Sequence, residues 1–189
     1  MPRFARSLLA VLCLATTAGP ALADDGAWAA LREPGTAALM RHATAPGVGD
    51  PPGFRLEDCA TQRNLNEAGR AEARATGAAL RERGVQVDRV LTSRWCRALH
   101  TAEEMNVAPV APEPVLDSFF GNWEDGKAQT ESLRSLLAER AGSEKLVLVT
   151  HQVNITALTG VHPASGEIVV IAMGADGKPA IRGRIAPGR

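Results

Sequence analysis

Short apolar runs alternate with helical patterns along this chain. Strands are predicted at 37–40, 89–92, 146–150 and 167–173, where Ala, Val, Leu, Ile or Met form the centre of each run. Between these runs, small or apolar residues recur every three or four positions, which is the pattern of a helix buried on one side. Strands that alternate with helices favour a largely parallel sheet between layers of helices. The pattern therefore predicts an α/β sandwich.

The clearest predicted helix follows Asn66, whose side chain can cap the first turn. One face of this helix carries mostly small residues, which suits close packing on a sheet, and Gly84 is placed to end it. The residues of that face are Gly69, Ala73, Thr76, Gly77 and Leu80. Ser93 is predicted to cap a second helix, and a third helix is predicted at 128–140. Each helix would cover part of the sheet.

Two connecting segments also carry information. Residues 44–61 are rich in Gly and Pro and predict a long loop, and a loop of this length inside a compact domain is usually functional. The sequence Ala-Asp-Gly-Lys at 175–178 is typical of a turn between two strands. The chain is therefore predicted to end in a hairpin that finishes near Ile185.

The N-terminal residues have the features of a secretory signal peptide. Two arginines among the first six residues precede a short apolar stretch at 8–16, and small residues at 21 and 23 have the spacing of a cleavage site. The apolar stretch is too short to span a bilayer. We therefore predict a cleaved signal peptide at 1–23 and a single domain at 24–189. The mature protein would be periplasmic or secreted, with no stable membrane anchor after cleavage.

The overall charge is balanced, since 21 Lys and Arg residues accompany 21 Asp and Glu residues. Because the chain also lacks a basic stripe, nucleic acid is not predicted as a partner. This balance does not exclude an anionic substrate. A local cluster of arginines can bind phosphate in a protein whose net charge is near zero.

The cysteines predict a disulfide bond. Cys13 lies in the predicted signal peptide, so the mature protein would keep Cys59 and Cys96. Two cysteines in an oxidising compartment favour a disulfide over free thiols. Because Cys96 precedes Arg97, this bond would clamp the 44–61 loop to the helix that carries Arg97.

Three of the predicted strands end in basic or imidazole side chains. The first runs into Arg41 and His42, the second leads to Arg97, and the third ends before His151. In open α/β sheets, ligands bind at the carboxyl ends of the strands, so these groups are expected to meet at one edge. A helix that starts at Ser93 would add free backbone N–H groups, which favour anions. The sequence therefore predicts a pocket for a phosphoryl group.

Four segments, in this order, resemble the motifs of the histidine phosphatase superfamily. Residues 39–43 resemble its strand that ends in Arg-His-Gly, with Ala43 in place of Gly, and residues 63–69 resemble its Leu-Thr-x-x-Gly helix start. Residues 92–103 follow its Ser-x-x-x-Arg-Ala-x-x-Thr-Ala-Glu segment, and residues 149–155 resemble the strand with its second histidine. The resemblance implies a three-layer α/β/α sandwich with a mainly parallel central sheet, as in phosphoglycerate mutase-like proteins.

The resemblance also implies a phosphomonoesterase mechanism. A nitrogen of His42 would attack phosphorus in line and form a phosphohistidine, which water then hydrolyses. Arg41, Arg97 and a protonated His151 would hold the phosphoryl oxygens and stabilise their charge in the transition state. Arg63 is a candidate for a further phosphate contact. The implied partner is a small phosphorylated substrate, and no metal or other cofactor is required.

The general acid of the family has no direct counterpart here. Members that act on ordinary phosphate esters place a Glu or Asp at the position that matches Ser118. The neighbouring Asp117 is therefore the candidate that would protonate the leaving oxygen. Two alternatives stay open without an acid. The protein could have a phosphohistidine phosphatase-like activity, which in this superfamily works without that acid, or it could be a non-catalytic phosphate-binding module.

The substrate is indicated only by a narrower resemblance. The sequence Arg-His-Ala-x-Ala-Pro at 41–46 is similar to exported members of the superfamily that act as lipopolysaccharide core heptose-phosphate phosphatases. This similarity makes a cell-envelope phosphate one expected substrate class.

Overall fold

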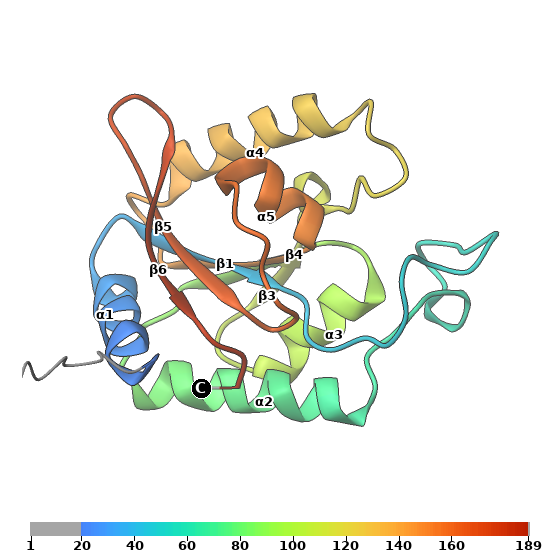
Figure 1. Ribbon diagram of the computed structural model, residues 1–189, viewed down its shortest axis with the longest axis horizontal. Helices are drawn as coiled ribbons and strands as arrows, with labels where there is room; N and C mark the ends of the chain where they lie inside the picture. The colour runs from blue at the N-terminus through green and yellow to red at the C-terminus, as the bar shows by residue number, and fades with distance from the viewer. Residues whose placement is uncertain (1–19, 189) are drawn as a thin grey trace, which may run out of the picture.

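The computed structural model describes residues 20–188, and a six-stranded mixed sheet lies at its centre (Figure 1). The strand order is β3-β2-β4-β1-β5-β6. The first four strands in this order are parallel to their neighbours, whereas β5 pairs antiparallel with β1 and β6. The strands are β1 (Thr36–Arg41), β2 (Arg89–Thr92), β3 (Val110–Pro112), β4 (Leu146–Thr150), β5 (Ile168–Met173) and β6 (Pro179–Ile185). The predicted mainly parallel sheet and C-terminal hairpin are confirmed.

Five α-helices within residues 20–188 cover the two faces of the sheet. They are α1 (Pro20–Arg32), α2 (Glu67–Glu82), α3 (Cys96–Met105), α4 (Gly126–Arg140) and α5 (Gln152–Thr159). Figure 1 shows α4 and α5 above the sheet and α1, α2 and α3 below it. The buried apolar residues form two clusters, one on each face. The predicted three-layer α/β/α sandwich is therefore confirmed.

The central strand β1 is buried on both faces. Ala38 and Met40 belong to the core cluster under α1, α2 and α3, whereas Ala37 and Leu39 belong to the cluster under α4 and α5. Successive side chains of a strand point to opposite faces, so a strand between two layers of helices must be apolar throughout. This double burial explains the continuous apolar run in the sequence, and it fixes the position of the residues that follow β1.

Helix α2 has the cap and the small-residue face that the sequence predicts. Asn66 Oδ1 accepts a hydrogen bond from Gly69 N at 2.8 Å. Gly77 lies so close to α3 that a Cβ added there would be 1.9 Å from the carbonyl oxygen of Met105. Gly84 follows the end of the helix with a φ of 71°, a conformation that glycine adopts without strain. Small residues are therefore required where α2 packs against its neighbours.

Three short or terminal elements were not predicted. β3 has three residues and ends in a proline, and α5 has eight residues, too few for a clear helical period. α1 begins at Pro20, so its first four residues belong to the predicted signal peptide at 1–23, the rest of which (residues 1–19) lies outside the described residues. The buried side chains described for α1 follow the predicted cleavage site after position 23, so cleavage would leave them in place. No helix within residues 20–188 is both long and apolar enough to cross a membrane.

Candidate active site

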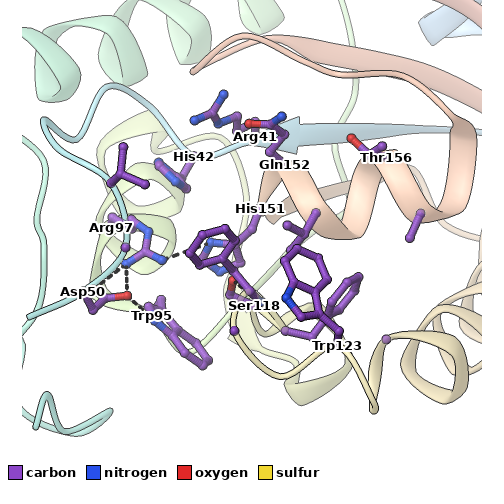
Figure 2. Close-up of a pocket in the computed structure, with 18 of the residues that line it drawn as sticks. Arg41, His42, Asp50, Trp95, Arg97, Ser118, Trp123, His151, Gln152 and Thr156 are labelled. Atoms are coloured by element: carbon purple, nitrogen blue, oxygen red, sulfur yellow. Dashed lines mark hydrogen bonds and ion pairs between the residues drawn. The ribbon is translucent and has the colours of Figure 1, made fainter. Parts of the chain in front are cut away.

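The ends of three neighbouring strands bring the predicted site residues together. β1, β4 and β2 lie side by side, and they lead into His42, His151 and the segment before Arg97. The side chains of His42, His151 and Arg97 are all buried. The two imidazole centroids are 5.5 Å apart, and Arg97 Nη2 lies 3.5 Å from His151 Nδ1. Together with Arg41, these residues line one cavity of about 1090 Å³ (Figure 2).

His42 is held as a neutral base with one free nitrogen. Its Nδ1 lies 2.8 Å from the carbonyl oxygen of Ala43. A carbonyl can only accept a hydrogen bond, so Nδ1 carries the proton and Nε2 keeps its lone pair. Burial is the main cause that lowers the pKa of His42 to about 3, and the charge of Arg97 lowers it further. At neutral pH the ring is therefore unprotonated and able to act as a nucleophile.

His151 is oriented by partners on both of its nitrogens. Nε2 lies 2.8 Å from Ser93 Oγ, and Nδ1 faces the Arg97 guanidinium, which can only donate. Nδ1 is therefore the acceptor, and Nε2 carries the proton. Burial, followed by the neighbouring His42 and Arg97, lowers the pKa of His151 well below its ordinary value. The ring is neutral here, and the protonated form that the family resemblance implies would need the charge of a bound phosphate.

Asp117 does not lie where a general acid is needed. Its carboxylate is buried and is not part of the cavity lining. One oxygen accepts hydrogen bonds from Arg94 N at 2.8 Å and Ser93 Oγ at 3.3 Å, and the other accepts from Arg94 Nε at 2.7 Å. This geometry argues against the predicted role of Asp117 in protonating a leaving group. Asp117 instead holds Ser93, and through Ser93 it orients His151.

Two buried arginine nitrogens lack a partner beside the histidines. Among the described residues, Arg41 Nε and Arg97 Nε have no hydrogen-bond acceptor. A buried donor without an acceptor is unfavourable, so these nitrogens are suited to the oxygens of an anion. Burial lowers the pKa of both arginines, that of Arg97 to about 10, which leaves them charged at neutral pH. Within residues 20–188, no group of three or more His, Cys, Asp or Glu side chains is arranged to hold a metal ion.

Asp50 is a site residue that the sequence interpretation missed. Its two oxygens accept hydrogen bonds from Arg97 Nη1 at 2.8 and 3.0 Å (Figure 2). Oδ2 also accepts from Trp95 Nε1 at 3.0 Å, and Oδ1 accepts from Arg63 N at 3.0 Å. The bonds to Trp95 and Arg63 hold the Asp50 carboxylate in place, and the carboxylate in turn orients the Arg97 guanidinium. The only sequence signal for Asp50 was its place in the long loop at 44–61, a region already predicted to be functional.

Arg63 mainly braces this loop. Its Nε donates to the carbonyl oxygen of Gly49 at 2.8 Å, and its Nη1 donates to the carbonyl oxygen of Ala45. The side chain also lines the cavity, and burial lowers its pKa although the nearby Asp50 raises it. Two of its three guanidinium nitrogens are thus engaged with loop carbonyls. Arg63 could therefore contribute to phosphate binding only through its positive charge and through Nη2.

The start of α3 differs from the prediction. The helix begins at Cys96 and has no side-chain cap, and the Ser93 hydroxyl is used by His151 and by Trp95 N at 3.2 Å. The backbone N–H groups of the approach to the helix are also engaged, because Arg94 N donates to Asp117 and Cys96 N donates to Gln62 Oε1 at 3.0 Å. These N–H groups are therefore not free for an anion, and the positive charge of the site comes from arginine side chains.

The predicted disulfide is present and joins the long loop to α3. Cys59 and Cys96 are bonded, with their Cα atoms 5.6 Å apart. Cys96 is the first residue of α3 and Arg97 is the second. The bond therefore anchors the loop directly beside the guanidinium that Asp50 contacts. Gln62 adds a second link, since its side chain bonds both Cys96 N and the loop carbonyls of 55 and 56.

The sequence matches the family model of the histidine phosphatase superfamily (branch 1) over residues 38–139, more than half of the chain. The match begins within β1 and ends within α4, and thus includes His42 and Arg97. His151 lies beyond its end. No curated protein matches the chain.

Solved structures share this fold at low sequence identity. The protein histidine phosphatase SixA complexed with tungstate is 22% identical, with a TM-score of 0.55, and the match covers 80% of this chain and 96% of SixA. Rv3214 from Mycobacterium tuberculosis is 15% identical, with a TM-score of 0.62 and coverage of 82% and 98%. Phosphoserine phosphatase from Entamoeba histolytica, in complex with 3-phosphoglyceric acid, is 14% identical, with a TM-score of 0.57 and coverage of 80% and 96%.

Proposed function

This chain belongs to the histidine phosphatase superfamily and is a phosphatase, and we propose that it is an exported phosphomonoesterase that forms a phosphohistidine on His42. One observation carries this proposal. The proton of His42 is held on Nδ1 by Ala43, so that Nε2 is free, and Arg41 and Arg97 line the same cavity as His42. A nucleophile and fixed positive charge therefore surround the same space.

The proposed reaction has two steps. Nε2 of His42 attacks phosphorus, the N–P bond forms, and the bond from phosphorus to the leaving oxygen breaks with its electron pair on that oxygen. Water then attacks phosphorus, the N–P bond breaks, and His42 and inorganic phosphate are released. The guanidinium groups of Arg41 and Arg97 would stabilise the charge of the equatorial oxygens. A phosphoryl dianion would also raise the pKa of His151 and favour its protonation.

The charges around the two histidines suit a dianion. Arg41, Arg63 and Arg97 contribute three positive charges, and Asp50 contributes one negative charge. The two positive charges that remain match a phosphate monoester, whose second pKa is about 6. A non-catalytic phosphate-binding module is the less favoured alternative, because binding alone does not require a free imidazole lone pair directed into the cavity.

No carboxylate that lines the cavity is placed as a general acid. The carboxylates that line it among the described residues are Asp50 and Glu131. Asp50 is directed at Arg97, and Glu131 lies on α4 in an ion pair with Arg134. Substrates whose leaving groups depart without protonation are therefore favoured. This observation supports the second candidate function, a phosphohistidine phosphatase-like activity, and the structural similarity to SixA agrees with it.

Export is proposed from the N-terminal sequence. The features of residues 1–23 indicate a signal peptide, and a disulfide is expected in an oxidising compartment. A periplasmic or secreted location is part of this proposal. A cell-envelope sugar phosphate is an alkyl ester, so it is the less favoured substrate class at a site where no carboxylic acid is placed at the leaving oxygen. The support for the substrate is the similarity of residues 41–46 to exported envelope members of the superfamily.

Substitution of the nucleophile tests the proposed function. Purified protein is incubated with acetyl phosphate, which is small and needs no general acid, and release of inorganic phosphate is measured. We expect His42→Ala to lower kcat by at least about 10³-fold, because the nucleophile is removed. His100→Ala is the matched control, since His100 does not line the cavity. Binding of vanadate by wild type without turnover of any phosphate substrate would favour the non-catalytic module.

A further inference from the structure

Exposed apolar side chains gather at the cavity. The exposed large hydrophobic side chains of the described part are Val48, Phe54, Phe120, Trp123 and Ile181. All of them except Ile181 line the cavity. Trp123 is 62% exposed and Phe120 is 55% exposed, which is unusual for rings of this size. Exposed apolar groups that cluster beside a polar site are typical of a ligand-binding surface.

The aromatic rings that line the cavity form two groups. The first group is Phe54 and Trp95, whose ring centroids are 5.8 Å apart. The second group lies on the segment before α4. There the ring centroid of Trp123 is 6.1 Å from that of Phe119 and 5.6 Å from that of Phe120. Both groups line the same cavity. In Figure 2, Trp95 lies beside Asp50, and Trp123 lies on the other side of His151.

The first group is fixed next to the phosphoryl site. The Trp95 ring contacts His151 edge to face, with centroids 5.6 Å apart. Its Nε1 donates to Asp50, the residue that also holds Arg97. The aromatic surface therefore lies directly beside the side chains that would bind the phosphoryl group. The leaving group of a substrate bound there would lie between the rings.

The chemistry of the site sets the same requirement independently. Without a carboxylic acid to protonate it, the leaving oxygen departs as an anion, which is easier when the pKa of its conjugate acid is low. A phenol such as the tyrosine side chain has a pKa of about 10, whereas water has a pKa of about 15.7, close to that expected for a simple alcohol. A phenolate is thus a far better leaving group than an alkoxide. An aryl phosphate would suit both the missing acid and the aromatic walls.

We propose that the substrate is an aryl phosphate, whose ring lies between Trp95 and Trp123 while His42 attacks its phosphorus. This inference rests on the proposed function and names the substrate class of the same site. The N–P bond forms as the bond from phosphorus to the aryl oxygen breaks, and the phenolate leaves with the electron pair and takes a proton from water. Stacking between rings contributes roughly 0.5–1.5 kcal/mol per aromatic pair, which corresponds to about 2- to 12-fold in affinity.

The test compares an aromatic with a non-aromatic substrate in matched variants. We measure kcat/KM for 2-naphthyl phosphate and for acetyl phosphate, neither of which requires a general acid. Trp123→Ala is expected to lower the ratio of naphthyl to acetyl phosphate efficiency about 3- to 10-fold. Trp123→Phe should restore most of the ratio, because it retains a ring. Ile181→Ala is the control, since it removes an exposed apolar side chain outside the cavity.

The outcomes separate this inference from the proposed function. If wild type hydrolyses acetyl phosphate but Trp123→Ala and Phe120→Ala leave the ratio unchanged, the aryl assignment is wrong and the phosphatase mechanism stands. The aryl assignment is also wrong if glycerol 2-phosphate, an alkyl ester, is hydrolysed as efficiently as 2-naphthyl phosphate. If neither acetyl phosphate nor 2-naphthyl phosphate is hydrolysed in a His42-dependent manner, both proposals fail. Thermal unfolding of each variant confirms that the protein is folded.

Discussion

The position of single protons decides what the site residues can do. The Ala43 carbonyl fixes the proton of His42 on Nδ1, and the Arg97 guanidinium and Ser93 hydroxyl fix that of His151 on Nε2. Neither assignment needs a charged imidazole, because each ring donates to an oxygen and keeps its other nitrogen free of hydrogen. The positive charge of the site is thus left to the arginines, which stay charged at neutral pH.

Asp50 is predicted to act as a positioning residue. Asp50→Asn removes the ion pair that fixes Arg97, so kcat should fall roughly 10- to 100-fold through loss of orientation. Inorganic phosphate should inhibit the variant at least as well as it inhibits wild type, because a competing negative charge is removed. Steady-state kinetics with phosphate as inhibitor measure both effects.

Glu57→Gln is the control for Asp50→Asn, since Glu57 is an exposed carboxylate in the same loop. An unchanged kcat in Asp50→Asn would show that Arg97 needs no partner. Weaker inhibition by phosphate would show that Asp50 helps to bind the anion rather than to place Arg97.

The buried His42 should make stability fall in acid. Its pKa is about 3 in the folded protein and 6.5 in the unfolded chain, so the unfolded chain takes up the proton first. The contribution of the neutral His42 ring to the free energy of unfolding is complete above pH 6.5, and it is lost as the pH falls from 6.5 towards 3. A shift of this size corresponds to roughly 5 kcal/mol.

Urea unfolding of wild type and His42→Gln, without phosphate, measures this pH dependence. The free energy of unfolding should fall more steeply in wild type than in the variant across that range, because the variant lacks the titrating ring. Parallel curves for the two proteins would contradict the burial of a neutral imidazole.

Elements were predictable where a local pattern determined them. The cap at Asn66 and the small face of α2 depend on neighbours in sequence, so both were found. The start of α3 was misplaced, because Ser93 has the composition of a cap but its hydroxyl is taken by His151 from a distant strand. Asp50 was missed for the same reason, since its partner Arg97 is 47 positions away. Local sequence does not reveal which distant group uses a side chain.

Close packing of α2 against α3 should make Gly77 sensitive to a single methyl group. In Gly77→Ala the new Cβ would be 1.9 Å from the Met105 carbonyl oxygen, so the two helices must move apart. We expect the free energy of unfolding to fall by about 1–3 kcal/mol, as measured by chemical denaturation. Gly142→Ala is the matched control, because no atom lies within 4 Å of the added Cβ there. Equal stability of the two variants would contradict the close approach.

Reduction of the disulfide should loosen the long loop and lower activity. The bond closes a loop of 37 residues in sequence separation and contributes about 3–4 kcal/mol in the chain-entropy model. Its loss should lower Tm and also kcat/KM, because the anchor beside Arg97 is released. The assay is repeated with excess dithiothreitol, and the double variant Cys59→Ser/Cys96→Ser serves as control, since reductant should not affect it. Full activity of the reduced wild type would exclude a role in placing Arg97.

At the scale of the whole molecule, the order of strands creates the site. The strands β2, β4 and β1 are adjacent in the sheet although they are far apart in sequence, so their ends deliver Arg97, His151 and His42 to one edge. The meeting of these side chains at one edge of the sheet was predictable, because parallel strands place their carboxyl ends together. The aromatic walls were not predictable, since they come from three separate segments of the chain whose approach depends on the complete fold.

Export remains a prediction at this scale. When the full chain is expressed with an intact secretion pathway, the mature protein should begin at Asp24 and lie outside the cytoplasm. N-terminal sequencing of the fractionated protein measures this directly. A full-length chain found in the cytoplasm would contradict both the signal peptide and the proposed location.

The mouth of the cavity has two unequal sides. The 44–61 loop is anchored by the disulfide bond and by the side chains of Arg63 and Gln62. The segment that carries Phe120 and Trp123 approaches this loop with the Phe120 ring near Gly49, where a Cβ added to the glycine would be 3.9 Å from Phe120 Cε1. A bulky substrate that has to widen this entrance would therefore displace the untethered side. Substitutions between Ser118 and Asp125 are therefore expected to change the rates of substrate entry and product release more than substitutions in the anchored loop.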